Sequence, residues 1–255
     1  VIYIATLLFL GSGLLGISHN FYWNAKPVAT LAIGSIFSTL QIVPLILLTL
    51  EAWQFRKLPR EVLTRQGVPL AQHQSQFSHS AAFGFLLAVN FWNFFGAGVF
   101  GFIVNLPIVN YYEHGSYLTV NHGHAAFMGV YGNLALGAMF FCVRYLVRDG
   151  VWSTRLIVSA VWSLNVGLFL MCLMDLFPAG IHQLNEIMNH GFWFARNEAF
   201  IQSSTFQTMT WARMLGGLIF VFGGLLPITI FMLTRAKKLK SFDDAKYPLI
   251  AEIVT

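Results

Sequence analysis

We predict an all-α fold, a polytopic bundle of about six transmembrane helices, from two features of the sequence. The first is composition, because hydrophobic residues make up 56% of the chain and charged residues only 10%. A soluble domain carries about 25% charged residues, so this chain has too few to cover a water-facing surface. The second is that the apolar residues fall into runs of the length that a membrane-spanning helix needs, about 20 residues. The sequence therefore indicates an integral membrane protein.

The expected helices follow from these runs in chain order. A polar linker at residues 54–76 separates the second span from the third, and a tail at residues 241–255 follows the last span. We therefore expect a membrane bundle over residues 1–240 and a cytoplasmic tail over residues 241–255. The chain begins inside an apolar run, which favours a piece of a longer protein. The six expected spans cover approximately residues 1–20, 28–53, 77–104, 118–145, 154–177 and 206–234.

Basic residues in the loops indicate the orientation of the bundle. Twelve of the fifteen lysines and arginines lie after the second, fourth and sixth spans. Such an excess marks the cytoplasmic side, so we expect both ends of this chain to be cytoplasmic. Because the positive charge is spread over loops and does not form one folded face, we expect no nucleic-acid partner. The twelve residues are Arg56, Lys57, Arg60, Arg65, Arg144, Arg148, Arg155, Arg235, Lys237, Lys238, Lys240 and Lys246.

Two histidines, His122 and His124, lie at the outer start of the fourth span. Two positions along an α-helix correspond to a rotation of about 200°, so the imidazoles leave opposite sides of one helix. They cannot share one metal ion, but each can hold a metal or a haem on its own side. Gly123 between them lets a bulky group approach the backbone. Ionisable residues inside a membrane are candidate functional residues, and the alternative is a polar pair at a wet helix end.

Two further polar positions belong to the first and second spans. His19 and Asn20 end the first span, and in the expected topology His19 lies at the same depth as His122. Two histidines at one depth on neighbouring spans are what a metal centre requires. Gln41 lies well inside the second span and must find a hydrogen-bond partner, so we expect it to face the bundle interior. Its alternative role is to join two helices.

Several segments resemble the catalytic subunit of the quinol-type nitric oxide reductases, within the haem–copper oxidase superfamily. The resemblance covers essentially the whole chain, which aligns with the last six helices of a longer protein. It implies that this chain is the carboxy-terminal part of such a subunit and that the amino-terminal helices are missing. The segments that carry the resemblance are residues 16–23, 34–41, 109–112, 114–115 and 121–127.

The resemblance implies a role for each matched residue. His122 matches the axial ligand of a high-spin haem b, and His124 matches one axial ligand of a low-spin haem b. His19 matches a ligand of the non-haem iron that faces the high-spin haem. The intact protein is therefore expected to hold two haems b and one non-haem iron. The other iron ligands and the second axial histidine of the family come from earlier helices, which this sequence does not contain.

Three departures from the family pattern point to one branch of it. The family has a histidine where this chain has Asn20, a buried glutamate where it has Gln41, and in quinol-oxidising relatives an acidic residue near Gly217. An amide oxygen is a weaker ligand for ferrous iron than imidazole, and a glutamine cannot ionise. These changes are similar to those of the nitric oxide dismutases, whose proposed reaction makes dinitrogen and dioxygen from two nitric oxides. Tolerated or engineered changes in an ordinary reductase are the alternative.

We therefore expect an oxidoreductase that converts nitric oxide, with dismutation favoured over reduction. The expected catalytic residues are His122, His19, Asn20 and Gln41, and His122 and His124 are the expected haem ligands. The expected setting is the bacterial inner membrane, with the active site toward the periplasm and the lipid bilayer as partner. Quinol as donor and a homodimer are further partners that we consider.

Two alternatives remain open at this point. One is a quinol-dependent reductase that makes nitrous oxide, and the other is a haem-binding electron-transfer subunit without enzyme activity. For His182 and His190 in an expected outer loop we predict ordinary roles. For His114 and Arg196, contact with a haem carboxylate is the alternative to an ordinary role.

Overall fold

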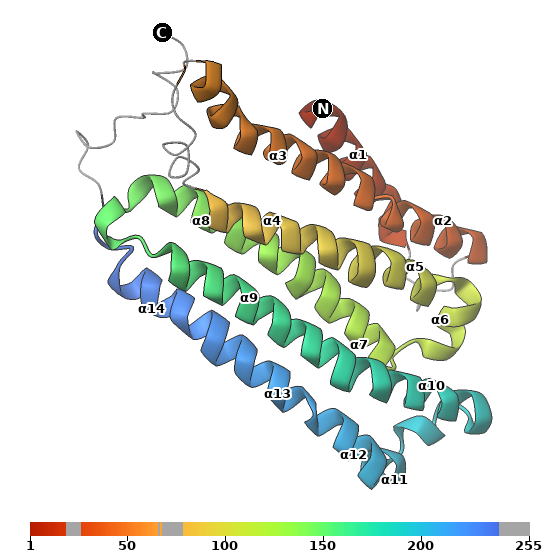
Figure 1. Cartoon of the computed structure of the whole chain (residues 1–255). Coiled ribbons are helices and arrows are strands. Elements are labelled where there is room, and N and C mark those ends of the chain that lie inside the picture. Colours follow the sequence, from red (N-terminus) through yellow and green to blue (C-terminus); the bar gives the residue numbers. More distant parts are fainter. Residues whose placement is uncertain (19–26, 66, 68–78, 240–255) are drawn as a thin grey trace.

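The computed structural model describes residues 1–18, 27–65, 67 and 79–239, and of residues 55–64 only the backbone. Within these ranges the chain is helical and forms no β-strand, which confirms the predicted all-α fold. The long helices run side by side (Figure 1). The turns around α6 and α11 lie at one end of the bundle, and the connection between α8 and α9 lies at the other.

The helices include four π-helical segments, η3, η4, η6 and η8, each of which continues an α-helix within a long span. Single π-turns inside α-helices widen the helix locally and are frequent at functional sites. The α-helices are α1 (Ile2–Gly16), α2 (Val28–Thr39), α3 (Ile42–Arg65), α4 (Ser80–Trp92), α5 (Phe100–Asn105), α6 (Pro107–Glu113), α7 (Tyr117–His124), α8 (Asn133–Leu146), α9 (Thr154–Met171), α10 (Phe177–His190), α11 (Glu198–Ile201), α12 (Ser204–Trp211), α13 (Arg213–Leu218) and α14 (Leu226–Thr234). The π-helical segments are η3 (Asn93–Val99), η4 (Ala125–Gly132), η6 (Cys172–Leu176) and η8 (Ile219–Leu225), and η5 (Asp149–Val151) and η7 (Phe194–Arg196) are short 3₁₀ turns.

In the described part of the chain, five helical stretches are long and apolar enough to cross a membrane. They correspond to the second through sixth expected spans, so the protein is a multi-pass membrane protein. The first expected span appears as the shorter apolar helix α1, which covers 15 residues in the part of the chain that is described. The five long helices are Val28–Gln54, Ser80–Asn105, Tyr117–Leu146, Thr154–His190 and Ser204–Thr234.

The fifth span is longer than the sequence predicted. We expected it to end near residue 177, but it continues through α10 to His190. The extension is amphipathic, since Gln183 and Ile187 are buried on one face and Asn185 and Asn189 are exposed on the other. His182 and His190 therefore lie on a helix, and the prediction of a loop there was wrong. The segment was predicted to be a loop because the polar side chains on its exposed face give it the composition of a loop.

The second span contains a break that bears on Gln41. Leu40 and Gln41 fall between α2 and α3. There the backbone N–H of Gln41 donates to the Ser38 carbonyl at 3.2 Å. Pro44 has no backbone N–H, so the Leu40 carbonyl loses its usual partner four residues later. Gln41 thus occupies a kink in the span, whereas the sequence suggested a regular helix.

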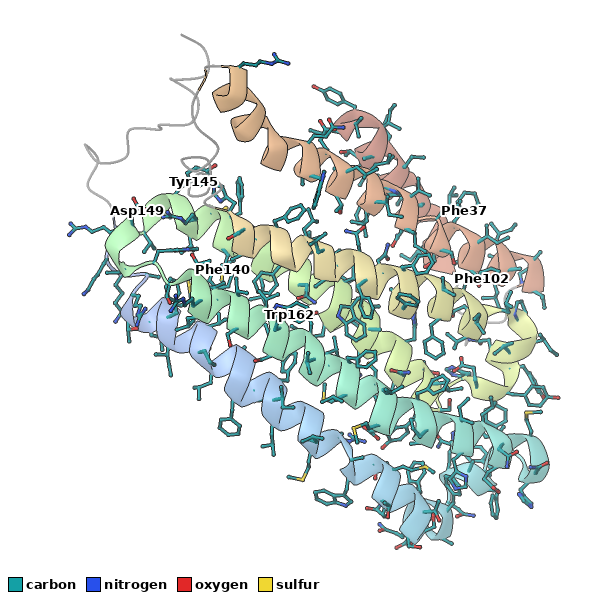
Figure 2. All side chains as sticks on the ribbon, viewed as in Figure 1. Phe37, Phe102, Phe140, Tyr145, Asp149 and Trp162 are labelled. Carbon is teal, nitrogen blue, oxygen red and sulfur yellow. The ribbon has the colours of Figure 1, made fainter. Side chains whose placement is uncertain are left out.

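Aromatic packing and a polar network hold the long helices together. Phe140 is 1% exposed and stacks with Phe85 at a ring distance of 5.7 Å, and Figure 2 labels it within the bundle. Asn165 accepts hydrogen bonds from Trp92 Nε1 at 2.8 Å and Asn133 Nδ2 at 3.0 Å. Inside a membrane such polar side chains join helices because lipid offers them no partner. These contacts fix α4, α8 and α9 relative to one another and so position α7, which continues into α8.

Candidate functional site

His122 lies on α7 and packs its imidazole against the neighbouring long helix Ser80–Asn105. Its Nδ1 lies 3.2 Å from the carbonyl oxygen of Gly96 in η3. A side-chain carbon at Gly101 would overlap the imidazole ring, so glycine is required at that position for the ring to lie where it does. Two glycines one and a half turns apart thus form the surface that receives His122.

The contact with Gly96 determines which nitrogen of His122 carries the proton. A carbonyl oxygen accepts only, so Nδ1 carries the proton and donates it, and Nε2 keeps its lone pair. Histidines that bind metals commonly donate their other N–H to a backbone carbonyl in this way. The His122 imidazole is therefore held with its proton on Nδ1.

His124 is held in the same form but on another side of the helix. Its Nδ1 lies 2.9 Å from the Val120 carbonyl of its own helix, and its ring is exposed. His122 contacts η3 and α5, whereas His124 lies within electrostatic range of Asp175 in η6. A side-chain carbon at Gly123, between the two histidines, would meet no atom within 4 Å. The two rings thus face different helices and the backbone between them borders open space.

The position of Gln41 is described, but the positions of His19 and Asn20 lie outside the described residues. Gln41 is half-buried, and its Nε2 lies 3.3 Å from where a side-chain carbon on Gly13 of α1 would be. The next residue, Ile42, packs so closely on Gly98 of η3 that a side chain on Gly98 would overlap it. The break at Gln41 therefore approaches the same helix that receives His122.

No cluster of three or more histidine, cysteine or acidic side chains suited to a metal ion forms within the described ranges.

An apolar cavity of about 480 Å³ borders this site. It is lined mainly by aromatic side chains and includes Gly96, the partner of His122, and Asn121, its neighbour in the chain. Small apolar molecules favour such a cavity over water. The aromatic residues of the lining are Phe91, Trp92, Phe95, Phe100, Phe169 and Phe177.

An ion pair inside the bundle was not predicted from the sequence. Asp175 is 1% exposed, and its Oδ2 lies 3.0 Å from Nε of Arg213, which is on α13. Arg213 also donates from Nη2 to the hydroxyl of Tyr117 at 3.1 Å. The three residues come from three different spans, so no spacing in the sequence connects them. The signal that was available is the presence of an acidic and a basic residue within apolar helices.

The turn between α6 and α7 holds a second buried acid, which the sequence analysis did not single out. Glu113 is 1% exposed and accepts a hydrogen bond from Thr119 Oγ1 at 3.0 Å. Burial raises the pKa of Glu113 to about 7, against the opposing effect of the Thr119 hydrogen bond. Burial of a carboxyl group disfavours its charged form. The pKa of Glu113, nine residues before His122, thus lies well above that of an exposed carboxyl group.

Arg196 ties this turn to the loop after α10. Its Nη2 donates to the His114 carbonyl at 2.7 Å, and its Nη1 donates to the Phe192 carbonyl at 3.0 Å. Burial, and to a lesser extent the Arg196 charge, lowers the pKa of the His114 imidazole. Arg196 thus fixes the backbone that leads into α7 and has a defined structural role there.

The sequence matches the family described as Cytochrome C and Quinol oxidase polypeptide I over residues 1–219. This is most of the 255-residue chain. The chain belongs to this family, within the haem–copper oxidases. The superfamily inferred from the motifs is therefore confirmed.

This haem–copper oxidase chain is also similar to the B subunit of nitric oxide reductase from Stutzerimonas stutzeri. The two are 28% identical over 233 residues, which is 87% of this chain and 44% of that relative. The chain therefore spans less than half the length of this relative. The match supports the nitric oxide reductase side of the superfamily and is equally compatible with a reductase and a dismutase.

Proposed function

We propose that the protein containing this chain is a membrane oxidoreductase that converts nitric oxide at a pair of metal centres. His122 is the axial ligand of a high-spin haem b, and His124 is one axial ligand of a low-spin haem b. His19, with Asn20 beside it, serves a non-haem iron that faces the first haem. The favoured reaction is dismutation of two nitric oxides to dinitrogen and dioxygen.

The observation that carries this proposal is that His122 and His124 are held in the same protonation form, each with its proton on Nδ1. Both imidazoles donate from Nδ1 to a backbone carbonyl, so in both rings Nε2 is the unprotonated nitrogen. A porphyrin supplies four equatorial nitrogens, so a single protein histidine on each side is sufficient. The close fit of the His122 ring over Gly101 and the open space at Gly123 suit one haem on each side of α7.

When bound, the high-spin haem and the iron supply the redox centre at which nitrogen–oxygen bonds change. The residues of this chain hold and surround that centre. His122, oriented by the Gly96 carbonyl, would hold the haem, and the apolar cavity beside it would accept a small uncharged substrate. Gln41 contributes an amide that neither takes up nor releases a proton at neutral pH.

The electron and proton balance favours dismutation. Reduction of two nitric oxides to nitrous oxide and water consumes two electrons and two protons, so it requires a donor site and proton carriers. Conversion of two nitric oxides to dinitrogen and dioxygen balances with neither. A glutamine at position 41 and a glycine at position 217 are then compatible with turnover, whereas a reductase loses two acidic groups.

The remaining parts of the proposal concern place and partners. Residues 1–240 form the catalytic bundle, incomplete without helices of the longer protein, and residues 241–255 form a cytoplasmic tail. The bundle lies in the bacterial inner membrane with the metal centres toward the periplasm. Quinol is the donor only if the enzyme is a reductase, and a homodimer is a proposed assembly.

A quinol-dependent reductase is the second candidate, and the name of the relative favours it. Isotope-labelled nitric oxide given to the full-length enzyme distinguishes the two candidates. A dismutase yields labelled dinitrogen and dioxygen without added donor. Labelled nitrous oxide as sole product, at a rate set by added quinol, overturns the dismutation proposal.

A non-enzymatic electron-transfer subunit is tested by carbon monoxide. Only a five-coordinate haem binds this ligand, so the proposed haem on His122 gives a carbon monoxide difference spectrum. A haem protein without that spectrum contradicts the enzyme proposal.

A further inference from the structure

We propose that the bundle carries a binding site for the headgroup of an anionic phospholipid at the connection between α8 and α9. The site is formed by four exposed basic residues, which we call the cationic patch: Arg148, Arg235, Lys237 and Lys238. It lies at the end of the bundle away from α7, which carries His122 (Figure 1). The inference goes beyond the proposed function and does not depend on it.

The cationic patch is assembled by backbone contacts between two segments that are far apart in the sequence. Val147 and Leu239 form an isolated antiparallel bridge. The backbone N–H of Arg148 donates to the Lys238 carbonyl at 3.1 Å, and Arg148 Nε donates to the Leu239 carbonyl at 2.9 Å. Arg148 is thus held beside the segment that follows α14, and the charges of both segments lie together. The orientation of a membrane protein requires only that basic residues are in the loops, and not that two loops are joined in this way.

Within the described ranges, no acidic side chain forms an ion pair with a residue of the cationic patch. Asp149, labelled in Figure 2, follows Arg148 in the chain, but its carboxylate pairs with Arg144. Arg144 also lies over the Trp152 ring, 5.1 Å from the ring centre. Because like charges repel one another, four cations held at one place favour an anion among them. The cationic patch therefore suits an anionic ligand.

The depth of the cationic patch in the membrane matches that of a phospholipid headgroup. Two of the long apolar helices end at Leu146 and Thr234. Arg148 is two residues beyond the first end, and Arg235 is one residue beyond the second. The charges therefore lie where the hydrocarbon layer meets the polar headgroups. Exposed leucines near these positions offer apolar contacts to the acyl chains of the same lipid. They are Leu146, Leu233 and Leu239.

The chemistry of the four side chains favours a phosphate with a net negative charge. Planar guanidinium groups match phosphate oxygens, and each lysine adds a compact positive charge. Clusters of four or more basic residues directly beyond a membrane helix bind anionic lipids, and each residue strengthens this binding about fivefold. A zwitterionic headgroup has a phosphate as well, but its own cation opposes the attraction. We therefore expect the site to prefer phosphatidylglycerol to phosphatidylcholine.

Native mass spectrometry of the full-length protein tests the proposal, with phosphatidylglycerol, phosphatidylcholine or inorganic phosphate as the titrant. We expect the first phosphatidylglycerol to bind at least about tenfold more tightly than the first phosphatidylcholine. Arg235→Gln should weaken phosphatidylglycerol binding about fivefold, and Lys237→Gln together with Lys238→Gln about 25-fold. Both lysines are joined to their neighbours by backbone hydrogen bonds, so the double variant should unfold in detergent at the wild-type temperature.

The control is Arg65→Gln. Arg65 is an exposed arginine in the last turn of α3, which ends apart from the α8–α9 connection (Figure 1). This variant should change phosphatidylglycerol binding by less than about twofold. Equal weakening in Arg65→Gln and Arg235→Gln shows a diffuse effect of charge and overturns the inference. Unchanged binding in the double lysine variant overturns it as well.

Two further outcomes identify another occupant of the cationic patch. Inorganic phosphate that binds as tightly as phosphatidylglycerol shows that the ligand is a free anion, which overturns the inference. The tail contains two acidic residues, Asp243 and Asp244. Lipid selectivity that appears only after both are replaced by asparagine shows that the tail occupies the cationic patch, and this result also overturns the inference.

Discussion

Replacement of Gly101 by alanine tests directly whether the His122 imidazole packs against this glycine. A Cβ at this position would lie 2.9 Å from Nδ1 and 3.2 Å from Nε2 of His122 and would overlap the carbon between them. Contacts between carbon atoms are favourable at about 3.5–4.0 Å, so the ring must move by about 1 Å. We expect this movement to break the contact with the Gly96 carbonyl, which already spans 3.2 Å.

The magnitude follows from two effects. Overpacking of a close-packed interior costs about 1–3 kcal/mol. Loss of the hydrogen bond that orients a histidine ligand reduces metal affinity about 10–100-fold. The high-spin haem should therefore be depleted in Gly101→Ala, while the low-spin haem on His124 is retained.

The assay is the carbon monoxide difference spectrum of the full-length protein, scaled to the spectrum of the low-spin haem. The control is Gly84→Ala in the same span, where the nearest atom to the new carbon is a Val161 methyl at 3.9 Å. If Gly101→Ala retained the full carbon monoxide signal, the assignment of His122 as the ligand of the open haem would be refuted. An equal loss in Gly84→Ala would show that any alanine in this helix is harmful.

Three further predictions concern stability and are measured by thermal unfolding in detergent. Gly216→Ala should destabilise by about 1–3 kcal/mol, since its new carbon would lie 2.5 Å from a backbone oxygen of α9, whereas Gly217→Ala, 4.0 Å from its nearest neighbour, should be neutral. Equal effects of the two would refute the close packing of α9 on α13. Asn165→Leu should cost about 1–3 kcal/mol because buried partners of its amide lose their hydrogen bonds, and an unchanged midpoint would contradict that network. Glu113→Gln should remove a pH dependence: burial raises the pKa of Glu113 to about 7, so the folded protein binds the proton more tightly and wild-type stability falls as pH rises toward that value. Parallel pH profiles for wild type and Glu113→Gln would show that Glu113 does not titrate there.

The spans were predictable because the bilayer imposes a simple rule on the chain. Apolar runs of sufficient length must be helices, since lipid offers the backbone no hydrogen-bond partner. The rule placed the five long helices near their observed positions. It failed at residues 178–190, where the helix leaves the apolar environment and packs one face on α7. Composition cannot distinguish such an extension from a loop, because five of its thirteen residues are exposed.

The candidate site was predictable only where its residues are close in sequence. The divergence of His122 and His124 follows from helix geometry over two residues. The partners of each ring do not, because Gly96, Gly101 and Asp175 come from other spans. The break at Gln41 was also missed, although Pro44, which has no backbone N–H to donate, is its physical cause. Local geometry could thus be read from the sequence, and contacts between spans required coordinates.

The two glycines at 216 and 217 bear on the choice between the two reactions. Gly216 lies against the Gly167 carbonyl, so packing alone requires a glycine there. Gly217 meets only the Met171 sulfur, at 4.0 Å, so its own packing does not exclude a larger side chain. The absence of an acid at this position is therefore not a consequence of helix packing. A reductase gains a proton or quinol contact from an acid there, whereas a dismutase gains nothing from it. A glycine at 217 is compatible with the proposed dismutation, whose net reaction consumes neither electrons nor protons.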